Sequence, residues 1–197
     1  MAKTILSPEE QELCKSLSFD IEIAELIKAH TGAPIGRLPA YGEDGDPLEE
    51  PGDGLCSETD EEKSYEFIDD QKDALRKEGY LIFLFEDDDE QKFLGILKGQ
   101  DEFDIIKFRK TNGVNSELQT KDIINKLQVW KKKDDFFIMG VGLDWIMAGF
   151  YELPDDMDAF AKELYEFAPD VVDQSEGEIS DLAGQLKDAE GFFLWWD

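Results

Sequence analysis

The sequence predicts an α+β fold, in which a mixed, mostly antiparallel sheet is covered by helices. Apolar runs typical of strands arrive in adjacent pairs and do not alternate one by one with helical patterns. Amphipathic helical patterns precede and follow each pair. The chain has 197 residues, of which 41% are hydrophobic, so it is long and apolar enough to bury a core.

The first third of the chain predicts helices separated by an acidic loop. The segment Ser7-Pro8-Glu9-Glu10 is a helix start, because Ser7 can cap, Pro8 fits the first helical position and Glu10 completes a capping box. A second helix is expected from Asp20 to Gly32, and a third from Ser64 to Lys77. Residues 39–63 are rich in Gly, Pro and acids and predict a loop.

The remaining segments predict two hairpins, further helices and a terminal strand. Residues 80–99 and 136–153 each hold two apolar runs around a turn, and the second turn falls near Gly142. The run 192–196 predicts a strand that is buried on both faces. Helical patterns cover the segments between and after the hairpins, namely residues 101–108, 120–133, 155–167 and 175–190.

Charge is the most unusual property of the sequence. With 48 acidic and 20 basic residues, the formal net charge is -28. Residues 41–90 hold 20 acids and 4 bases, whereas residues 91–133 hold 5 acids and 10 bases. A field of this sign repels nucleic acid and anionic membranes and attracts basic partners, so neither nucleic acid nor membrane is expected as a partner. The alternative is that the acidity only keeps the protein soluble.

The lack of a long apolar segment and the low numbers of His and Cys indicate the compartment and exclude several kinds of active site. The start of the chain shows no apolar signal segment, and the sequence holds no apolar run long enough to span a bilayer. Both observations favour a cytoplasmic protein. His30 is the single histidine, and Cys14 and Cys56 are the only cysteines, so neither a zinc site nor a histidine-based triad is expected. Because phosphate-loop and dinucleotide motifs are also absent, we expect no cofactor.

Carboxylate chemistry remains possible. Asp144, Asp170 and Asp173 stand at the ends of predicted elements, where they could hold Mg²⁺ or form an acid/base pair. The other interpretation of Asp170 and Asp173 is that they cap and hydrogen-bond the backbone after a helix that Pro169 ends.

Two further features are candidate binding residues. Trp145 follows a turn and is of a type that often anchors interfaces. The tip of the first hairpin carries four adjacent acids that could bind a cation or stay solvated, namely Asp87, Asp88, Asp89 and Glu90.

Five blocks of the sequence carry a family resemblance. They are LKGQDEFDIIKFRKTNGVN (97–115), TKDIINKLQVW (120–130), GVGLDW (140–145), YEFAPDVVDQ (165–174) and LWWD (194–197). Through them, the region from about residue 80 to 197 resembles bacterial proteins of domain-of-unknown-function family 4253. The resemblance implies an α+β domain over residues 80–197 after a helical region over 1–79, and it brings no activity and no functional residues.

These observations favour a non-enzymatic interaction module that binds a basic protein partner such as a toxin, in the manner of an immunity protein or inhibitor. The alternatives are a carboxylate-dependent, metal-assisted enzyme that uses Asp144, Asp170 and Asp173, and an inhibitor that mimics DNA. The sequence does not predict the oligomeric state.

Overall fold

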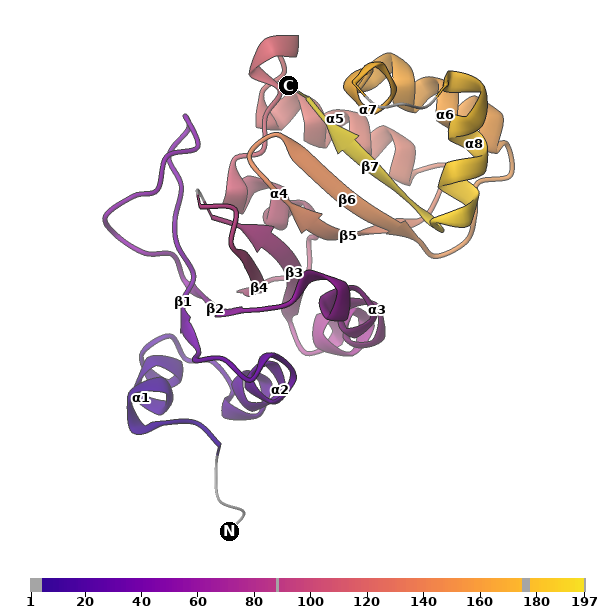
Figure 1. Cartoon of the computed structure of the whole chain (residues 1–197). Coiled ribbons are helices and arrows are strands. Elements are labelled where there is room, and N and C mark those ends of the chain that lie inside the picture. Colours follow the sequence, from indigo (N-terminus) through magenta and orange to yellow (C-terminus); the bar gives the residue numbers. More distant parts are fainter. Residues whose placement is uncertain (1–4, 88, 175–177, 197) are drawn as a thin grey trace. The chain divides into compact units, whose positions relative to one another are not determined.

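The computed structural model describes residues 5–87, 89–174 and 178–196, and it divides into two compact units, residues 1–101 and 102–197 (Figure 1). Both units combine helices with an antiparallel sheet, which confirms the α+β prediction. The boundary predicted at residue 80 does not coincide with this division. Residues 80–98 form two strands, and the second of them pairs with a strand that precedes residue 80.

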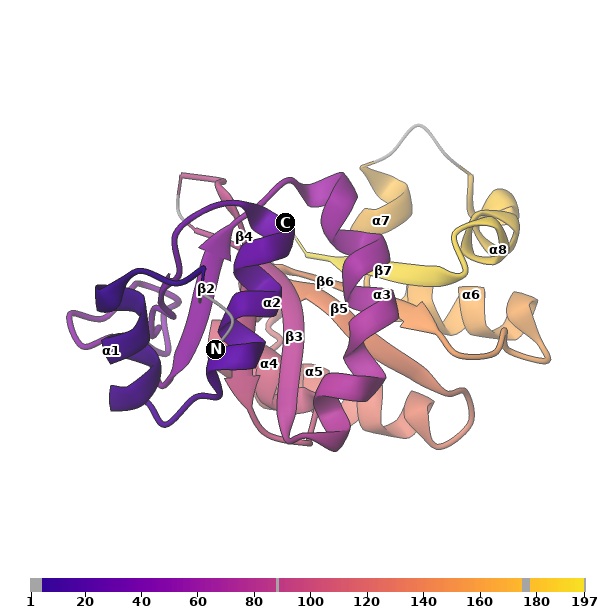
Figure 2. The ribbon, with the colours of Figure 1, turned by 90° about the horizontal axis from the view of Figure 1, so that it is seen from below.

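The unit of residues 1–101 is built on four strands in the order β1-β2-β4-β3, all paired antiparallel. Its elements are α1 (Pro8–Ser16), α2 (Ile21–Thr31), β1 (Gly36–Arg37), β2 (Gly54–Glu58), α3 (Glu61–Lys77), β3 (Tyr80–Glu86) and β4 (Lys92–Lys98). Helices α2 and α3 lie on the same side of these strands (Figures 1 and 2).

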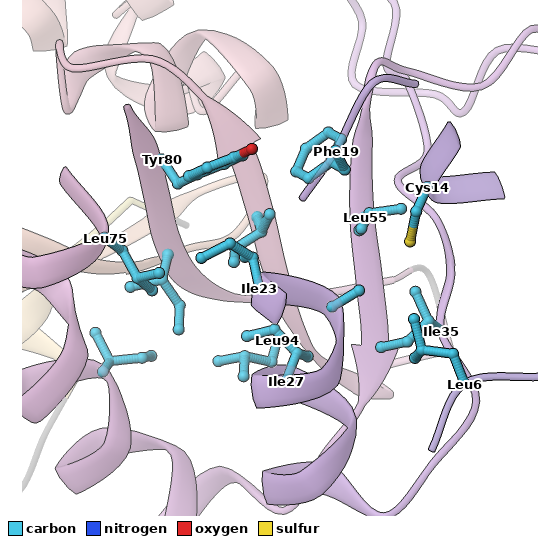
Figure 3. Close-up of a cluster of buried hydrophobic side chains, with 14 of the residues drawn as sticks. Leu6, Cys14, Phe19, Ile23, Ile27, Ile35, Leu55, Leu75, Tyr80 and Leu94 are labelled. Carbon is cyan, nitrogen blue, oxygen red and sulfur yellow. The ribbon is translucent and has the colours of Figure 1, made fainter. Parts of the chain in front are cut away.

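The core of this unit lies between the helices and the sheet. Ile23 and Ile27 of α2 face Leu94 of β4, with Tyr80 and Leu55 beside them (Figure 3). The β-branched and leucine side chains that alternate along β2, β3 and β4 supply the sheet side of this cluster. The helix predicted over residues 20–32 is therefore confirmed, and its apolar positions form the buried stripe of α2.

The prediction of an unbroken loop over residues 39–63 is wrong. Strand β2 occupies residues 54–58, and α3 starts at Glu61 behind the N-cap Asp60. The rest of the segment is held by its own backbone, because Leu48 N–H donates to Ala40 O at 2.8 Å and Gly52 N–H donates to Leu38 O at 2.8 Å.

The unit of residues 102–197 is a three-stranded meander in which β6 pairs with both β5 and β7 (Figure 1). Its elements are α4 (Phe103–Arg109), the 3-10 turn η1 (Val114–Ser116), α5 (Thr120–Lys131), β5 (Phe136–Val141), β6 (Trp145–Phe150), α6 (Met157–Phe167), α7 (Asp170–Asp173), α8 (Ile179–Asp188) and β7 (Gly191–Trp195). Both predicted hairpins, β3-β4 and β5-β6, are therefore confirmed.

Aromatic side chains join the helices of this unit to its sheet. Trp130 of α5 is 1% exposed. It packs edge-on against Phe192 of β7 at 5.9 Å and against Phe167 of α6 at 5.7 Å. Phe160 of α6 packs on the same tryptophan at 5.1 Å. The terminal strand is not buried on both faces as predicted, since Phe193 is 41% exposed.

No helix in the described part of the chain is both long enough and apolar enough to span a bilayer.

The buried carboxylate of Glu10 connects three segments of the first unit. Glu10 is 6% exposed and accepts hydrogen bonds from the backbone N–H groups of Ser7 at 2.6 Å and Ile35 at 2.7 Å. It also forms an ion pair with Lys28 of α2. Burial acts to raise the pKa of Glu10, but the bonds from Lys28, Ile35 and Ser7 together lower it below its ordinary value.

Replacement of Glu10 by Gln is expected to lower the free energy of unfolding by about 2–4 kcal/mol, because it leaves a partly buried lysine without its partner. Since the pKa is lowered by folding, the wild-type contribution is present above pH 4.5 and is lost as pH falls through the lowered value. Chemical denaturation between pH 3 and 7 measures both effects. The exposed neighbour Glu9, changed to Gln, is the control. Equal stability of the two variants at pH 7 would contradict this role of Glu10.

Candidate functional site

A groove in the first unit lies where α1 meets the start of α2. It encloses about 1010 Å³ and opens to solvent. Its lining comes from α1, from the connection to α2, from the first turn of α2 and from the residue that caps α3, namely Pro8, Gln11, Glu12, Lys15, Phe19, Asp20, Ile21, Glu22, Ile23 and Glu78.

Local signals at both ends of α1 position one wall of this groove. The predicted capping box is present, because Ser7 Oγ accepts from Glu10 N–H at 3.2 Å while Glu10 accepts from Ser7 N–H. The helix ends at Ser16, and Ser18, two residues further on, has a left-handed φ of 54°. Lys98 of β4 donates to the carbonyls of Leu17 and Ser18, each at 2.7 Å, so a cation satisfies the end of α1.

The floor of the groove is apolar. Phe19 and Ile23 are only 5% and 6% exposed and belong to the core of the unit (Figure 3). Ile21 is different, since it is 44% exposed although it stands between them. An exposed isoleucine in a hollow that is backed by core residues is available for contact with another molecule.

The rim of the groove is acidic. Four carboxylates face one ammonium group, Lys15, which forms an exposed pair with Glu12 at 3.6 Å. Glu22 and Glu78 have no ion-pair partner among the described residues. The rim therefore keeps excess negative charge that the fold does not neutralise.

Asp20 is fixed by a tyrosine of the sheet. Tyr80 Oη donates to Asp20 Oδ2 at 3.2 Å and accepts from Asp20 N–H at 3.2 Å. Burial is the main reason that the pKa of Tyr80 is raised. Because the Asp20 side chain makes no cap hydrogen bond, α2 starts without a side-chain cap at the edge of the groove.

Sequence reasoning missed this groove, although one signal pointed to it. Ile21 stands off the buried stripe of α2 that Ile23 and Ile27 define, and two acids flank it. An exposed apolar residue outside the buried stripe of a helix and next to acids is typical of a contact surface. The sequence alone could not show that α1 faces it.

The acidic tip of the β3-β4 hairpin is partly used by the turn itself. Asp87 Oδ1 accepts from the N–H groups of Asp89 and Gln91, each at 3.0 Å. Glu90 adopts a left-handed φ of 61° and donates its N–H to Asp87 O at 3.1 Å. Asp89 and Glu90 are exposed, whereas Asp88 lies outside the described residues.

A smaller hollow of about 270 Å³ lies on the other face of this sheet and is lined mainly by rings and prolines, namely Arg37, Pro39, Tyr41, Pro47, Cys56, Phe85, Asp87 and Phe93. Arg37 is held by Gly52 O at 2.8 Å and by Asp53 at 3.0 Å, so its guanidinium group already has partners.

In the second unit, Asp144 and Trp145 belong to a turn that several backbone groups hold. Asp144 O accepts from Trp196 N–H at 3.0 Å, and the hydroxyl of Thr111 donates to Gly142 O at 2.7 Å. Trp145 is 8% exposed and lies so close to Gly142 that an added Cβ would be 1.9 Å from its indole nitrogen. The structure thus gives Trp145 a packing role in this turn.

Asp170 and Asp173 lie on the short helix α7, where their carboxylates accept from side chains. Asp170 accepts from Gln174 Nε2 at 3.2 Å, and Asp173 accepts from Tyr165 Oη at 2.9 Å. Both carboxylates therefore take part in side-chain contacts around α7.

No group of three or more His, Cys, Asp or Glu residues that could hold a metal ion occurs within residues 5–87, 89–174 and 178–196. Asp144, Asp170 and Asp173 therefore do not form such a group. The turn of Asp144 and the segment that precedes α7 both bond to Trp196, whose indole N–H donates to Phe167 O at 3.1 Å.

Three lysines of the basic stretch, Lys126, Lys131 and Lys133, are paired within the second unit. Glu163 of α6 accepts from Lys133 at 3.1 Å and lies 3.6 Å from Lys126. Its hydrogen bond from Lys133 is the main reason that the pKa of Glu163 is lowered. Lys131 forms ion pairs with Glu102 at 2.5 Å and Asp135 at 3.2 Å.

Replacement of Gly142 by Ala is expected to lower the free energy of unfolding by about 1–3 kcal/mol, because the new methyl group would overlap the Trp145 indole. The control is Gly184→Ala in α8, where an added Cβ meets nothing within 4 Å. That change should raise helix stability by about 0.5–1 kcal/mol. Thermal unfolding measures both variants, and equal shifts would contradict the packing role.

Both cysteines are expected to be unreactive in the folded protein. Cys14 and Cys56 are buried and unbridged, and burial raises the pKa of Cys56 to about 12. At pH 8 the reactive thiolate of Cys56 is then rarer than in an ordinary thiol by about three orders of magnitude. A colorimetric thiol reagent should react slowly with the native protein and with two thiols after unfolding. Rapid reaction of either thiol in the folded protein would contradict the claim that both cysteines are buried.

Comparison with known proteins gives one family match. Residues 93–197, more than half of the chain, match the family model described as Domain of unknown function (DUF4253). The match begins inside β4, later than the start near residue 80 that the resemblance indicated. No curated protein and no solved structure matches the chain. The chain therefore belongs to the family described as Domain of unknown function (DUF4253).

Proposed function

We propose that the protein is a non-enzymatic interaction module of the immunity or inhibitor kind, which binds a basic protein partner such as a toxin. The single observation that carries this proposal is the acidic groove of the first unit. Its rim keeps the carboxylates of Glu22 and Glu78 without ion-pair partners among the described residues, above an apolar floor that exposes Ile21.

Electrostatics explains why a basic partner suits this arrangement. Lys126, Lys131 and Lys133 are engaged locally, because Glu163, Glu102 and Asp135 pair with them. A partner with complementary charge would be steered to the acidic surface, and partners of like charge would be repelled. The net charge of -28 then contributes to association as well as to solubility.

The other functions considered gain less support from the residues described. A metal-assisted enzyme needs converging ligands, and the three candidate carboxylates do not form a group that could hold a metal ion. DNA mimicry needs acids spaced like phosphates along one face, whereas the acids of the groove stand beside apolar residues. The cytoplasm as the compartment belongs to the same proposal and is supported by two buried thiols without a disulfide.

Co-purification from the native host tests the proposal. Tagged protein is expected to retain one basic protein at about 150 mM salt and to lose most of it at about 500 mM, because salt screens exposed charges. Retention should fall for the double variant Glu22→Gln/Glu78→Gln. The matched control is Glu49→Gln/Glu50→Gln, which removes two exposed acids outside the groove. Absence of any basic partner at 150 mM salt would overturn the proposal.

A further inference from the structure

We infer that the groove between α1 and α2 receives an amphipathic helix of the partner, with its apolar face over Ile21 and its lysine or arginine side chains on the acidic rim. This inference rests on the proposed function and deepens it, because it names the binding surface and the shape of the segment that fills it.

The floor requires apolar groups in the occupant. Phe19 and Ile23 are held in the core, so the surface beneath Ile21 cannot move away from a bound side chain (Figure 3). Ile21 is 44% exposed in the free protein. A purely charged, flexible tail would leave this surface in water, whereas an apolar side chain would cover it and gain about 25 cal/mol per Å² of apolar area removed from water.

The rim requires cations at the sides of the occupant. Glu12 and Lys15 belong to α1, whereas Asp20 and Glu22 belong to the start of α2 and Glu78 follows α3. Carboxylates therefore stand on more than one side of the apolar floor. A segment with an apolar face between two rows of lysine or arginine matches this distribution, which is the charge complementarity that selects a basic occupant.

The lining favours a helix over an extended strand. All of the lining residues come from helices, their caps and one connection, and none comes from a strand. An added strand needs a sheet edge that offers backbone N–H and C=O groups, which this groove does not present. Side-chain-lined grooves between helices accept amphipathic helices instead. The nine residues of α1 span about 13 Å, which corresponds to between two and three turns of a bound helix.

Two synthetic peptides test the inference on the full-length protein. One is a peptide of Lys, Leu and Ala with leucines at i, i+3, i+4 and i+7, and the other has the same composition in an order without a helical apolar face. Fluorescence anisotropy at 150 mM salt measures the dissociation constant of each labelled peptide. The amphipathic peptide is expected to bind at least about tenfold more tightly, because only it can place apolar side chains over Ile21.

Two variants locate the binding. Ile21→Ser should weaken the amphipathic peptide about five- to tenfold and leave the other peptide unchanged, because it removes apolar area from the floor. Ile179→Ser is the matched control, since Ile179 is also the first residue of a helix and is 47% exposed, but lies in the other unit. Circular dichroism of each variant, compared with the wild type, confirms that the fold is unchanged.

The possible outcomes separate this inference from the proposed function. If both peptides bind equally and Ile21→Ser has no effect, the inference about the groove is overturned. The proposal that the acidic protein binds basic partners then still holds. If neither peptide binds at 50 mM or at 150 mM salt, both are overturned. If Ile179→Ser weakens binding as much as Ile21→Ser, the helix does not dock in the groove.

Discussion

A carboxylate that the fold buries determines the shape of the groove. Glu10 belongs to α1, and its ion-pair partner Lys28 belongs to α2. Glu10 also accepts a hydrogen bond from the N–H of Ile35, the residue that precedes β1. A buried charge is tolerated only when its hydrogen-bonding capacity is filled, and here three donors fill it. Helix α1 is short and only weakly amphipathic, so this polar contact supplements its limited apolar packing and keeps it beside α2.

Charged residues have different roles in the two units. In the second unit, Glu163 gathers Lys126, Lys133 and the indole N–H of Trp130, and aromatic rings pack the helices onto the sheet. Charges there stabilise the fold. In the first unit, Glu22 and Glu78 have no such role within the described residues. Acids without an ion-pair partner in the fold remain available to a partner. The candidate groove lies outside residues 93–197, which match the family model.

Local signals explain what could be predicted from the sequence. The capping box at Ser7, the hairpin of residues 80–99 and the amphipathic pattern of α6 depend on neighbouring residues, and all three are confirmed. Strand β2 was missed because Gly54, Ser57 and the surrounding turn residues conceal its alternation, and its strand pairing comes from distant β1 and β4. The first three residues of the helical pattern predicted over 175–190 lie outside the described residues. The groove depends on the packing of α1 against α2, which no local pattern encodes.

Hydrogen exchange of the backbone amides, measured for the protein alone and with its co-purified basic partner, tests the central claim most directly. The account predicts new protection within residues 8–23 and around Glu78, where the partner would cover the groove. Amides of β5, β6 and β7 should exchange at unchanged rates. Protection confined to residues 102–196, with residues 8–23 unaffected, would contradict the claim that the groove is the binding surface.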